Sequence, residues 1–349
     1  MKRPMTSRKS ARAAAGILLA LAIAGGPLAF GQSLDVPAKT WGLSFGNSKE
    51  FTGLRFNFRD SRVRRVTGVN VTFWQPAKND EDSVIKGLSL GIMPGGGDVT
   101  GIQLGLLGVD GLKNLTGISI GLLGAGAGDD VTGINIGGLG VGAGENLRGI
   151  NIGGLGVGAG EDMAGVNLGL LGAGAGKNVV GVTVGGLGAG AGKNMKGVGI
   201  GGLGVGAGKN MTGLLLGGFG AGAGENLKGI AIGGVGVGAG EKLVGLAVGG
   251  VGVGAPVVQG VMIGGIGVGG KSLTGAFLAG ALIKVERHGR LSGFAASPVT
   301  LIKGSLNGLA IGIVNYAWSL EKGLQIGLVN IIRDNPKGRK VLPIFNTRF

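Results

Sequence analysis

Apolar residues alternate with polar or glycine residues over short stretches, and this alternation restarts every 16 residues through the centre of the chain. In residues 133–148, two isoleucines flank Asn135, and a period of two is typical of a β-strand. After Gly137 and Gly138 the parity changes, and Leu139 begins a second alternation with glycine. A change of parity across two glycines indicates a bend between two short strands.

A polar segment closes the same unit. Glu145 and Asn146 follow the second strand, and they predict a turn because Asn adopts left-handed backbone readily and Glu favours solvent. Leu147 is then expected to return to the interior. One unit therefore contains two short strands and two turns.

The unit repeats with strict spacing. It restarts at Gly101, Gly117, Gly133, Gly149, Gly165, Gly181, Gly197, Gly213 and Gly229, and the units that begin at Gly245 and Gly260 have 15 residues. Looser copies begin at Gly53, Gly68, Gly87, Gly275, Gly293, Gly308 and Gly323. A coil that closes after 16 residues predicts an all-β, repetitive β-solenoid, in which about 18 glycine-rich coils stack about 4.8 Å apart.

Equivalent residues of successive coils should form columns along the rod. We expect two apolar columns inside it, formed by Ile118, Ile134, Ile150, Val166, Val182 and Val198 and by Leu123, Leu139, Leu155, Leu171, Leu187 and Leu203. We also expect ladders of stacked asparagines, whose amides bond along the axis, at Asn135, Asn151 and Asn167 and, in the turn, at Asn178, Asn194 and Asn210.

The two ends of the array differ from its centre in aromatic content. Residues 101–274 contain one aromatic residue, Phe219, whereas the flanking segments contain several Phe and Trp. Solenoids need atypical end units that shield the open core and the open sheet edges. We therefore predict four regions: a signal peptide (1–31), an N-terminal cap with degenerate repeats (32–86), a glycine-rich repeat body (87–274), and C-terminal degenerate repeats with a cap (275–349).

The N-terminal segment predicts export. Five basic residues between Lys2 and Arg12 precede the apolar segment 13–24, which is too short to span a bilayer. Ala29 and Gly31 place small residues before a cleavage site, with an uncleaved anchor as the alternative. We expect the protein at the cell surface, in the outer membrane or in the periplasm of a bacterium.

Composition narrows the class further. The chain has 85 Gly but is 44% hydrophobic and 15% charged, which excludes a disordered low-complexity chain. It has no Cys, which excludes a disulfide framework and thiolate metal sites. The net charge is +15, yet the segment 87–274 has nine basic and nine acidic residues, so the body lacks the basic stripe of a nucleic-acid-binding protein.

The positive charge of the mature chain gathers near its C-terminal end. Residues 275–349 contain ten basic and three acidic side chains. We expect that anionic envelope phosphates contact these basic side chains, through Lys322, Arg333, Lys337, Arg339 and Lys340. The exposed edges at the rod ends also allow end-to-end self-association.

A family resemblance rests on the C-terminal residues. The run GLAIGIVNYAWSLEKGLQIGLVNIIRDNP and the closing LPIFNTRF, in residues 308–349, resemble the bacterial surface-repeat family first described in leptospires. The resemblance implies an exported or surface-associated protein and supplies no catalytic residues. The body departs from the family unit, because Gly140 stands where the C-terminal units have Asn315 and Asn330.

Candidate chemistry is sparse. Residues 265–272 match a phosphate-loop pattern, but the next repeat begins at Gly275, where that loop needs a helix. His288 is the only histidine, and it lies in a charged turn without clustered ligands. We therefore expect no catalytic residue, no metal site and no cofactor, and we interpret the chain as non-enzymatic; an enzyme or nucleotide binder is the weakest alternative.

An outer-membrane β-barrel with a pore or anchoring role is the stronger alternative. Val341, Phe345 and Phe349 share one parity, like the terminal strand of such barrels. The parity change within each unit and the scarcity of aromatics disfavour it. The favoured interpretation is an exported cell-envelope or surface repeat protein with a structural or interaction role and an unknown envelope or surface partner.

Overall fold

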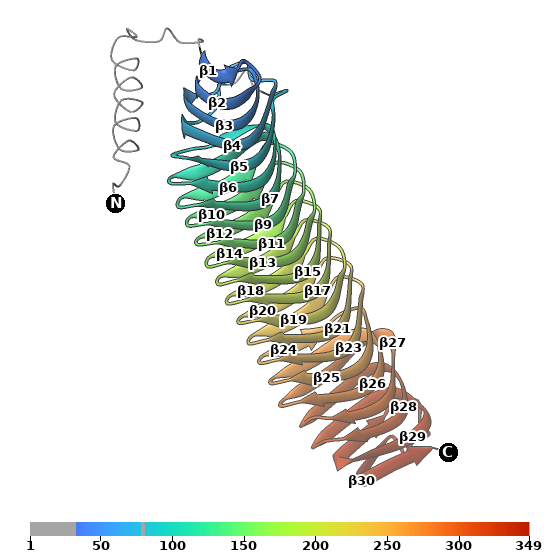
Figure 1. The fold of residues 1–349 in the computed structure, drawn as a ribbon. Coiled ribbons are helices and arrows are strands. Elements are labelled where there is room, and N and C mark those ends of the chain that lie inside the picture. Colours follow the sequence, from blue (N-terminus) through green and yellow to red (C-terminus); the bar gives the residue numbers. More distant parts are fainter. Residues whose placement is uncertain (1–32, 78–80, 349) are drawn as a thin grey trace, which may run out of the picture.

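The computed structural model describes residues 33–77 and 81–348, and these residues form one long β-solenoid (Figure 1). The chain winds through about 17 coils. Strands of successive coils pair in parallel, so that Ile134 pairs with Ile150 and Ile150 with Val166. The described part contains no helix, including none long and apolar enough to cross a membrane. The predicted all-β solenoid is confirmed; the predicted signal peptide, residues 1–31, lies outside the described residues.

The strands fall into an irregular first part, a regular centre and a C-terminal part with longer strands. The first part consists of β1 (Ser33–Ala38), β2 (Trp41–Gly46), β3 (Glu50–Arg59), β4 (Arg65–Trp74), β5 (Val84–Gly91), β6 (Gly95–Gly105) and β7 (Gly108–Gly121). The centre alternates four-residue and longer strands: β8 (Gly124–Ala127), β9 (Val131–Gly137), β10 (Gly140–Ala143), β11 (Leu147–Gly153), β12 (Gly156–Ala159), β13 (Met163–Gly169), β14 (Gly172–Ala175), β15 (Asn178–Gly185), β16 (Gly188–Ala191), β17 (Asn194–Gly201), β18 (Gly204–Ala207), β19 (Met211–Gly217), β20 (Gly220–Ala223), β21 (Asn226–Gly233), β22 (Gly236–Ala239) and β23 (Lys242–Gly249). The last part consists of β24 (Gly252–Gly254), β25 (Val257–Gly264), β26 (Gly267–Ala279), β27 (Leu282–Ala296), β28 (Val299–Ile311), β29 (Val314–Ile332) and β30 (Val341–Arg348).

Antiparallel strands lie at both ends of the rod. β1 pairs with β2 at one end, and β30 pairs with β29 at the other. A closed barrel requires its first and last strands to pair with each other, whereas β1 and β30 lie at opposite ends of the rod (Figure 1). The β-barrel alternative is therefore wrong.

A glycine bends the longer strand of each coil. Gly133 has a φ of +123°, and a Cβ there would overlap the carbonyl oxygen of Gly117 in the preceding coil. Only glycine fits this backbone and this close approach. Val131 before the bend is buried, and Ile134 directly after it is exposed. Val131 and Asn135 lie on either side of Gly133 and are both buried, so the inward parity of the strand continues through this position.

The structure reverses the faces that the alternation predicts. The expectation that the columns of Ile134 and Leu139 lie inside the rod is wrong, because these two side chains are 40% and 51% exposed. Of the residues expected inside, Val182 and Val198 have intermediate exposure and all the others are exposed. The prediction places a parity change at Gly137–Gly138, whereas the buried residues Asn135, Val141 and Leu147 all share one parity, so the isoleucines face outward.

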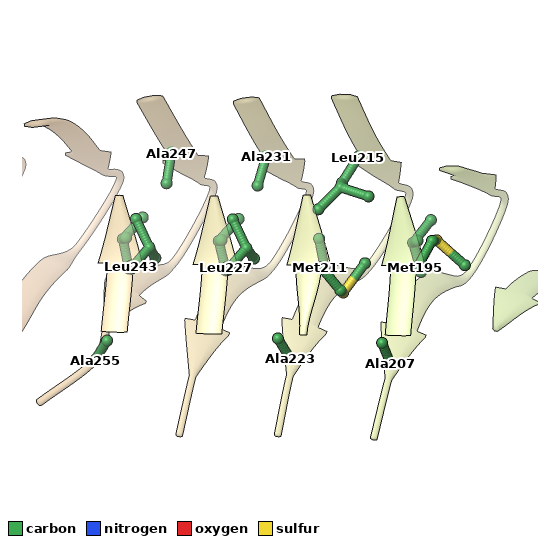
Figure 2. Packing of buried hydrophobic residues seen from close by; sticks show 14 of the residues in the cluster. Met195, Ala207, Met211, Leu215, Ala223, Leu227, Ala231, Leu243, Ala247 and Ala255 are labelled. Carbon is green, nitrogen blue, oxygen red and sulfur yellow. The ribbon is translucent and has the colours of Figure 1, made fainter. Parts of the chain in front are cut away.

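The interior is instead filled by the column of Leu147 and by buried residues that share its parity. Leu147 is fully buried, as predicted, and its column continues along the rod as Met163, Val179, Met195, Met211, Leu227 and Leu243. Figure 2 shows part of this column facing alanines of the short strands and residues such as Leu215 and Ala231 from the longer strands. Each coil thus buries only a few medium-sized side chains.

Both predicted asparagine ladders form. Inside the rod, Asn135 donates from Nδ2 to Oδ1 of Asn151 at 2.8 Å, and Asn151 donates likewise to Asn167 at 2.8 Å. In the turn, Asn194 and Asn210 donate along the axis over 2.9 and 3.0 Å. These hydrogen bonds between side-chain amides link consecutive coils and satisfy polar groups that would otherwise cost stability when buried.

Candidate functional site

The outward positions on either side of the Asn135 column form an apolar surface. We call apolar face the columns of Ile134 and Ile136 together with the Leu139 column in the adjoining turn. Exposed members in the first two columns are Ile102, Leu104, Ile118, Ile120, Ile134, Ile150, Ile152, Val166, Leu214, Ile230, Ile232, Val261, Ile263 and Leu278. Exposed members in the third are Leu123, Leu139, Leu155, Leu171, Leu187, Leu203, Phe219, Val235, Val251 and Ile266. Contiguous apolar patches on soluble monomers rarely exceed a few hundred Å², so a surface of this extent indicates an interaction site.

A column whose charged residues are all basic runs beside the apolar face, on the other side of Gly133. The strand register aligns Thr52, Thr67, Lys86, Thr100, Thr116, Thr132, Arg148, Ala164, Val180, Lys196, Thr212, Lys228, Val244, Gln259, Thr274, Ser292, Asn307 and Lys322. We call this the basic column. Its charged members Lys86, Arg148, Lys196, Lys228 and Lys322 are all exposed. Arg148 also reaches Asp130 at 3.8 Å.

The five basic residues expected to contact anionic phosphates do not form one cluster. Lys322 belongs to the basic column, and Arg333 follows β29 directly. Lys337, Arg339 and Lys340 lie in the connection between β29 and β30. All five are exposed, so each is accessible to an anion. Arg339 lines a cleft beside Phe345 and Arg348, and Arg333 lines a second, separate cleft.

That cleft lies where β27, β28 and β29 lose their register. Val285 pairs with Ile302, but the next pair is Arg290 with Ser305, so residues 286–289 form a bulge beside two residues of β28. His288 lies in the bulge with a φ of 57°. A second irregularity places Lys303 and Gly304 opposite a single residue of β29. Bulges of this kind are over-represented beside functional sites, because they redirect side chains.

The cleft has a volume of about 660 Å³ and combines cationic, hydroxyl and aromatic groups. Its lining includes Arg287, His288, Lys303, Tyr316, Trp318 and Arg333. The guanidinium of Arg333 lies 4.6 Å from the centre of the Trp318 ring. From the sequence, His288 is predicted to be an isolated residue of a charged turn. Of the residues that line the cleft, only Arg333 is predicted to contact an anion. A usable signal is the 18-residue spacing from Gly275 to Gly293, which marks an insertion in the 16-residue repeat.

The remaining candidate motifs adopt repeat structure. The phosphate-loop match ends inside β26, which contains Lys271 and Ser272 as strand residues in place of a helix. Among the described residues, no group of three or more His, Asp or Glu side chains is placed to hold a metal ion. Comparison of the chain with protein-family models, with curated proteins and with solved structures gives no match.

Proposed function

We propose that this chain is an exported repeat protein of the bacterial cell envelope whose rod lies flat on an anionic lipid surface. The observation that carries the proposal is the apolar face with the basic column beside it. Apolar side chains enter the boundary between acyl chains and headgroups, and neighbouring Lys and Arg bind anionic headgroups. The role is structural or adhesive, and it uses no catalytic residue.

The backbone of the apolar face suits contact with lipid. Its strands are hydrogen-bonded on both sides to the strands of adjacent coils, as β11 is to β9 and β13. Unpaired backbone groups are costly in hydrocarbon, and a continuous parallel sheet leaves none along its length. Charge complementarity favours a lipid surface over a second copy of the chain, because two basic columns would repel each other in a face-to-face dimer.

Two features of the sequence support an envelope location. Residues 1–31 have the pattern of a signal peptide, and residues 308–349 resemble the leptospiral-type surface-repeat family. The basic residues of the C-terminal end, Lys337, Arg339 and Lys340, are accessible and add attraction to anionic phosphates. The proposal therefore combines export, an apolar face and a cationic border in one function.

Vesicle flotation tests the proposal. The purified protein should float with vesicles of phosphatidylethanolamine and phosphatidylglycerol, and far less with phosphatidylcholine alone. Ile134→Ser with Ile150→Ser should weaken binding at least about tenfold, because two side chains lose their burial in lipid. Lys196→Gln with Lys228→Gln should remove about 1 kcal/mol per charge at low salt, roughly thirtyfold together, and less at high salt.

Matched controls separate the apolar face from general surface properties. Gly142→Ser with Gly158→Ser alters outward positions of the short strands, where an added Cβ lies 3.9 Å from the nearest backbone oxygen. Lys193→Gln removes a basic residue that lies in the turn, outside the basic column. Both controls should bind as the unaltered protein does. Equal flotation of all variants, or a dimer in analytical ultracentrifugation that dissociates on Ile134→Ser, would contradict lipid docking.

A further inference from the structure

The geometry of the C-terminal cleft points to a binding site for an anionic sugar, meaning a sugar ring that carries a phosphate or carboxylate group. This inference is independent of lipid docking, because the cleft lies at one end of the rod and draws on other residues. The sugar is either free or the terminal unit of an envelope glycan. Both sources present the same chemistry to the cleft.

The charge of the cleft selects an anion. Arg287, Lys303 and Arg333 line it, and no acidic side chain does. In the described part of the chain, none of these three cations forms an ion pair, whereas the neighbouring Arg290 is paired with Glu321 at 3.1 Å. Three uncompensated cations around one cleft favour phosphate or carboxylate, and the two guanidinium groups can bind either group in a bidentate manner.

The other lining groups select a ring with hydroxyls. Tyr316 and Trp318 supply aromatic surface, and Ser305 and Ser319 supply hydroxyls. Within the described residues these two serine hydroxyls make no hydrogen bond to the protein, so they are free to bond a ligand. Arg333 lies over the Trp318 ring, and this cation–π contact holds one of the cations beside the aromatic surface. Cations beside an aromatic ring and free hydroxyls match a charged sugar better than a bare anion.

The size and shape of the cleft agree with this ligand. A volume of about 660 Å³ lies within the range of pockets that hold small organic molecules. The cleft exists because the bulge of β27 leaves space above Gly304, which is buried under the preceding coil. A Cβ at Gly304 would overlap the carbonyl oxygen of Gly289, so the close approach of these two strands depends on glycine. The cleft is thus fixed by the coil backbone rather than by a loose loop.

Isothermal titration calorimetry of the purified protein tests the inference with three probes. Glucose 1-phosphate should bind at least about tenfold more tightly than inorganic phosphate, since only the sugar phosphate uses the aromatic surface. Neutral glucose should bind undetectably. A phosphorylated core oligosaccharide from bacterial lipopolysaccharide distinguishes the sources: tighter binding than glucose 1-phosphate supports a glycan end, and weaker binding supports a free sugar.

Variants link the binding to the cleft. Arg287→Gln and Lys303→Gln should each weaken glucose 1-phosphate binding at least about tenfold and reduce its dependence on salt. Trp318→Leu should weaken glucose 1-phosphate but leave inorganic phosphate almost unchanged. Lys337→Gln, an exposed basic residue of the same end outside the cleft, is the control and should have no effect.

Three results would overturn the inference: no binding of either phosphate probe, equal affinity for inorganic phosphate and glucose 1-phosphate, or an equal loss on Lys337→Gln. Failure here is distinguishable from failure of lipid docking, because the cleft variants leave the apolar face intact. They should float with phosphatidylglycerol vesicles as the unaltered protein does. Circular dichroism and melting temperature of each variant establish that the rod remains folded.

Discussion

The two halves of the rod differ at one interior position of the coil. In the N-terminal half the column that contains Asn135 is polar, and its buried members are Ser44, Arg55, Asn70, Ser89, Gln103, Ser119, Asn135, Asn151, Asn167 and Thr183. Beyond Gly199 the same column becomes Leu215, Ala231, Ala247, Met262, Phe277, Ala295 and Ala310, and it ends in the buried polar residue Gln325. The backbone register continues unchanged across the junction, so the coil accepts either chemistry at this position.

Most members of the polar column form hydrogen bonds along the axis, whereas the hydroxyls of Ser89 and Thr183 have no partner among the described residues. Arg55 donates to Asp60 at 2.7 Å and to Asn70 at 2.9 Å, and the side-chain amide of Gln103 donates to Ser119 Oγ at 2.8 Å. Buried polar groups are costly without partners, and a column of stacked amides and hydroxyls supplies the partners from the neighbouring coils. The apolar column needs no partner and is held by packing alone. The polar half therefore couples each coil to its neighbours more specifically than the apolar half does.

The largest effect should follow from placing an amide in the apolar half. Ala231→Asn buries a polar side chain between Leu215 and Ala247, which offer no hydrogen bond. We expect a loss of about 3 kcal/mol in the free energy of unfolding, from desolvation and overpacking together. Urea denaturation followed by circular dichroism measures it. An unchanged urea midpoint would mean that this interior position accepts an amide in the apolar half as well as in the polar half.

A smaller loss should follow from interrupting the polar column. Asn151→Leu leaves the Asn135 amide nitrogen and the Asn167 amide oxygen without the partners they have at 2.8 Å. We expect a loss of about 2 kcal/mol, because each orphaned buried group costs about 1 kcal/mol or more. Amide hydrogen exchange should show the loss in β9, β11 and β13 first, since a solenoid coil contacts only its neighbours.

The triple variant with Leu at positions 135, 151 and 167 sharpens this prediction. It removes all three amides, including the Asn135 oxygen and the Asn167 nitrogen that have no partner in the folded protein. Replacing both partners of a buried hydrogen bond is often nearly neutral. The triple variant should therefore be more stable than Asn151→Leu alone. If it is less stable, the ladder stabilises the rod through more than partner satisfaction.

Substitution of outward glycines in the short strands should change the stability of the rod equally in both halves. Gly142 and Gly238 lie in one outward column, and the same column carries Asp110, Lys284 and Leu301 near the ends of the rod. A Cβ fits at both glycines, at 3.9 and 3.6 Å from the nearest backbone oxygen. Gly142→Ala and Gly238→Ala should each raise stability by about 0.4–1 kcal/mol, because alanine restricts the unfolded chain.

An interior glycine serves as the contrast for these two variants. A Cβ at Gly137 would overlap the carbonyl oxygen of Gly140, so Gly137→Ala should destabilise the rod. The melting temperatures of the three variants, measured under the same conditions, test whether the outward glycines accept a Cβ and the interior glycine does not. A gain for Gly142→Ala without one for Gly238→Ala would show that the halves also differ on their outer surface.

The smallest effect concerns the pH dependence of a single carboxyl group in the N-terminal half. Burial raises the pKa of Asp110 above its ordinary value of 3.8, so the folded chain disfavours the charged form. The charge therefore lowers stability at neutral pH, and the loss is recovered as the pH falls through the raised pKa towards 3.8. Asp110→Asn should raise the melting temperature slightly at pH 7, and this gain should vanish near pH 3. A gain that is equal at both pH values would contradict a raised pKa at the half-buried Asp110.

The sequence by itself determined the period of the coil and the residues that repeat. Strict 16-residue spacing, short alternating strands and polar turns favour the solenoid, and the two asparagine ladders follow from the spacing because amides one coil apart stack. Export and the contact with anionic phosphates stay predictions from the sequence.

Only the tertiary structure decided which side of each strand faces inward. The sequence predicts a parity change across Gly137–Gly138, whereas Asn135, Val141 and Leu147 are all buried and share one parity. An error of one residue in parity exchanges the two faces of a strand. The alignment of Arg148, Lys196 and Lys228 follows from spacings of 48 and 32 residues, which are whole multiples of the repeat, but the side of the rod on which they lie was decided by the tertiary structure. The cleft depends on a bulge whose position is set by pairing between coils rather than by local sequence.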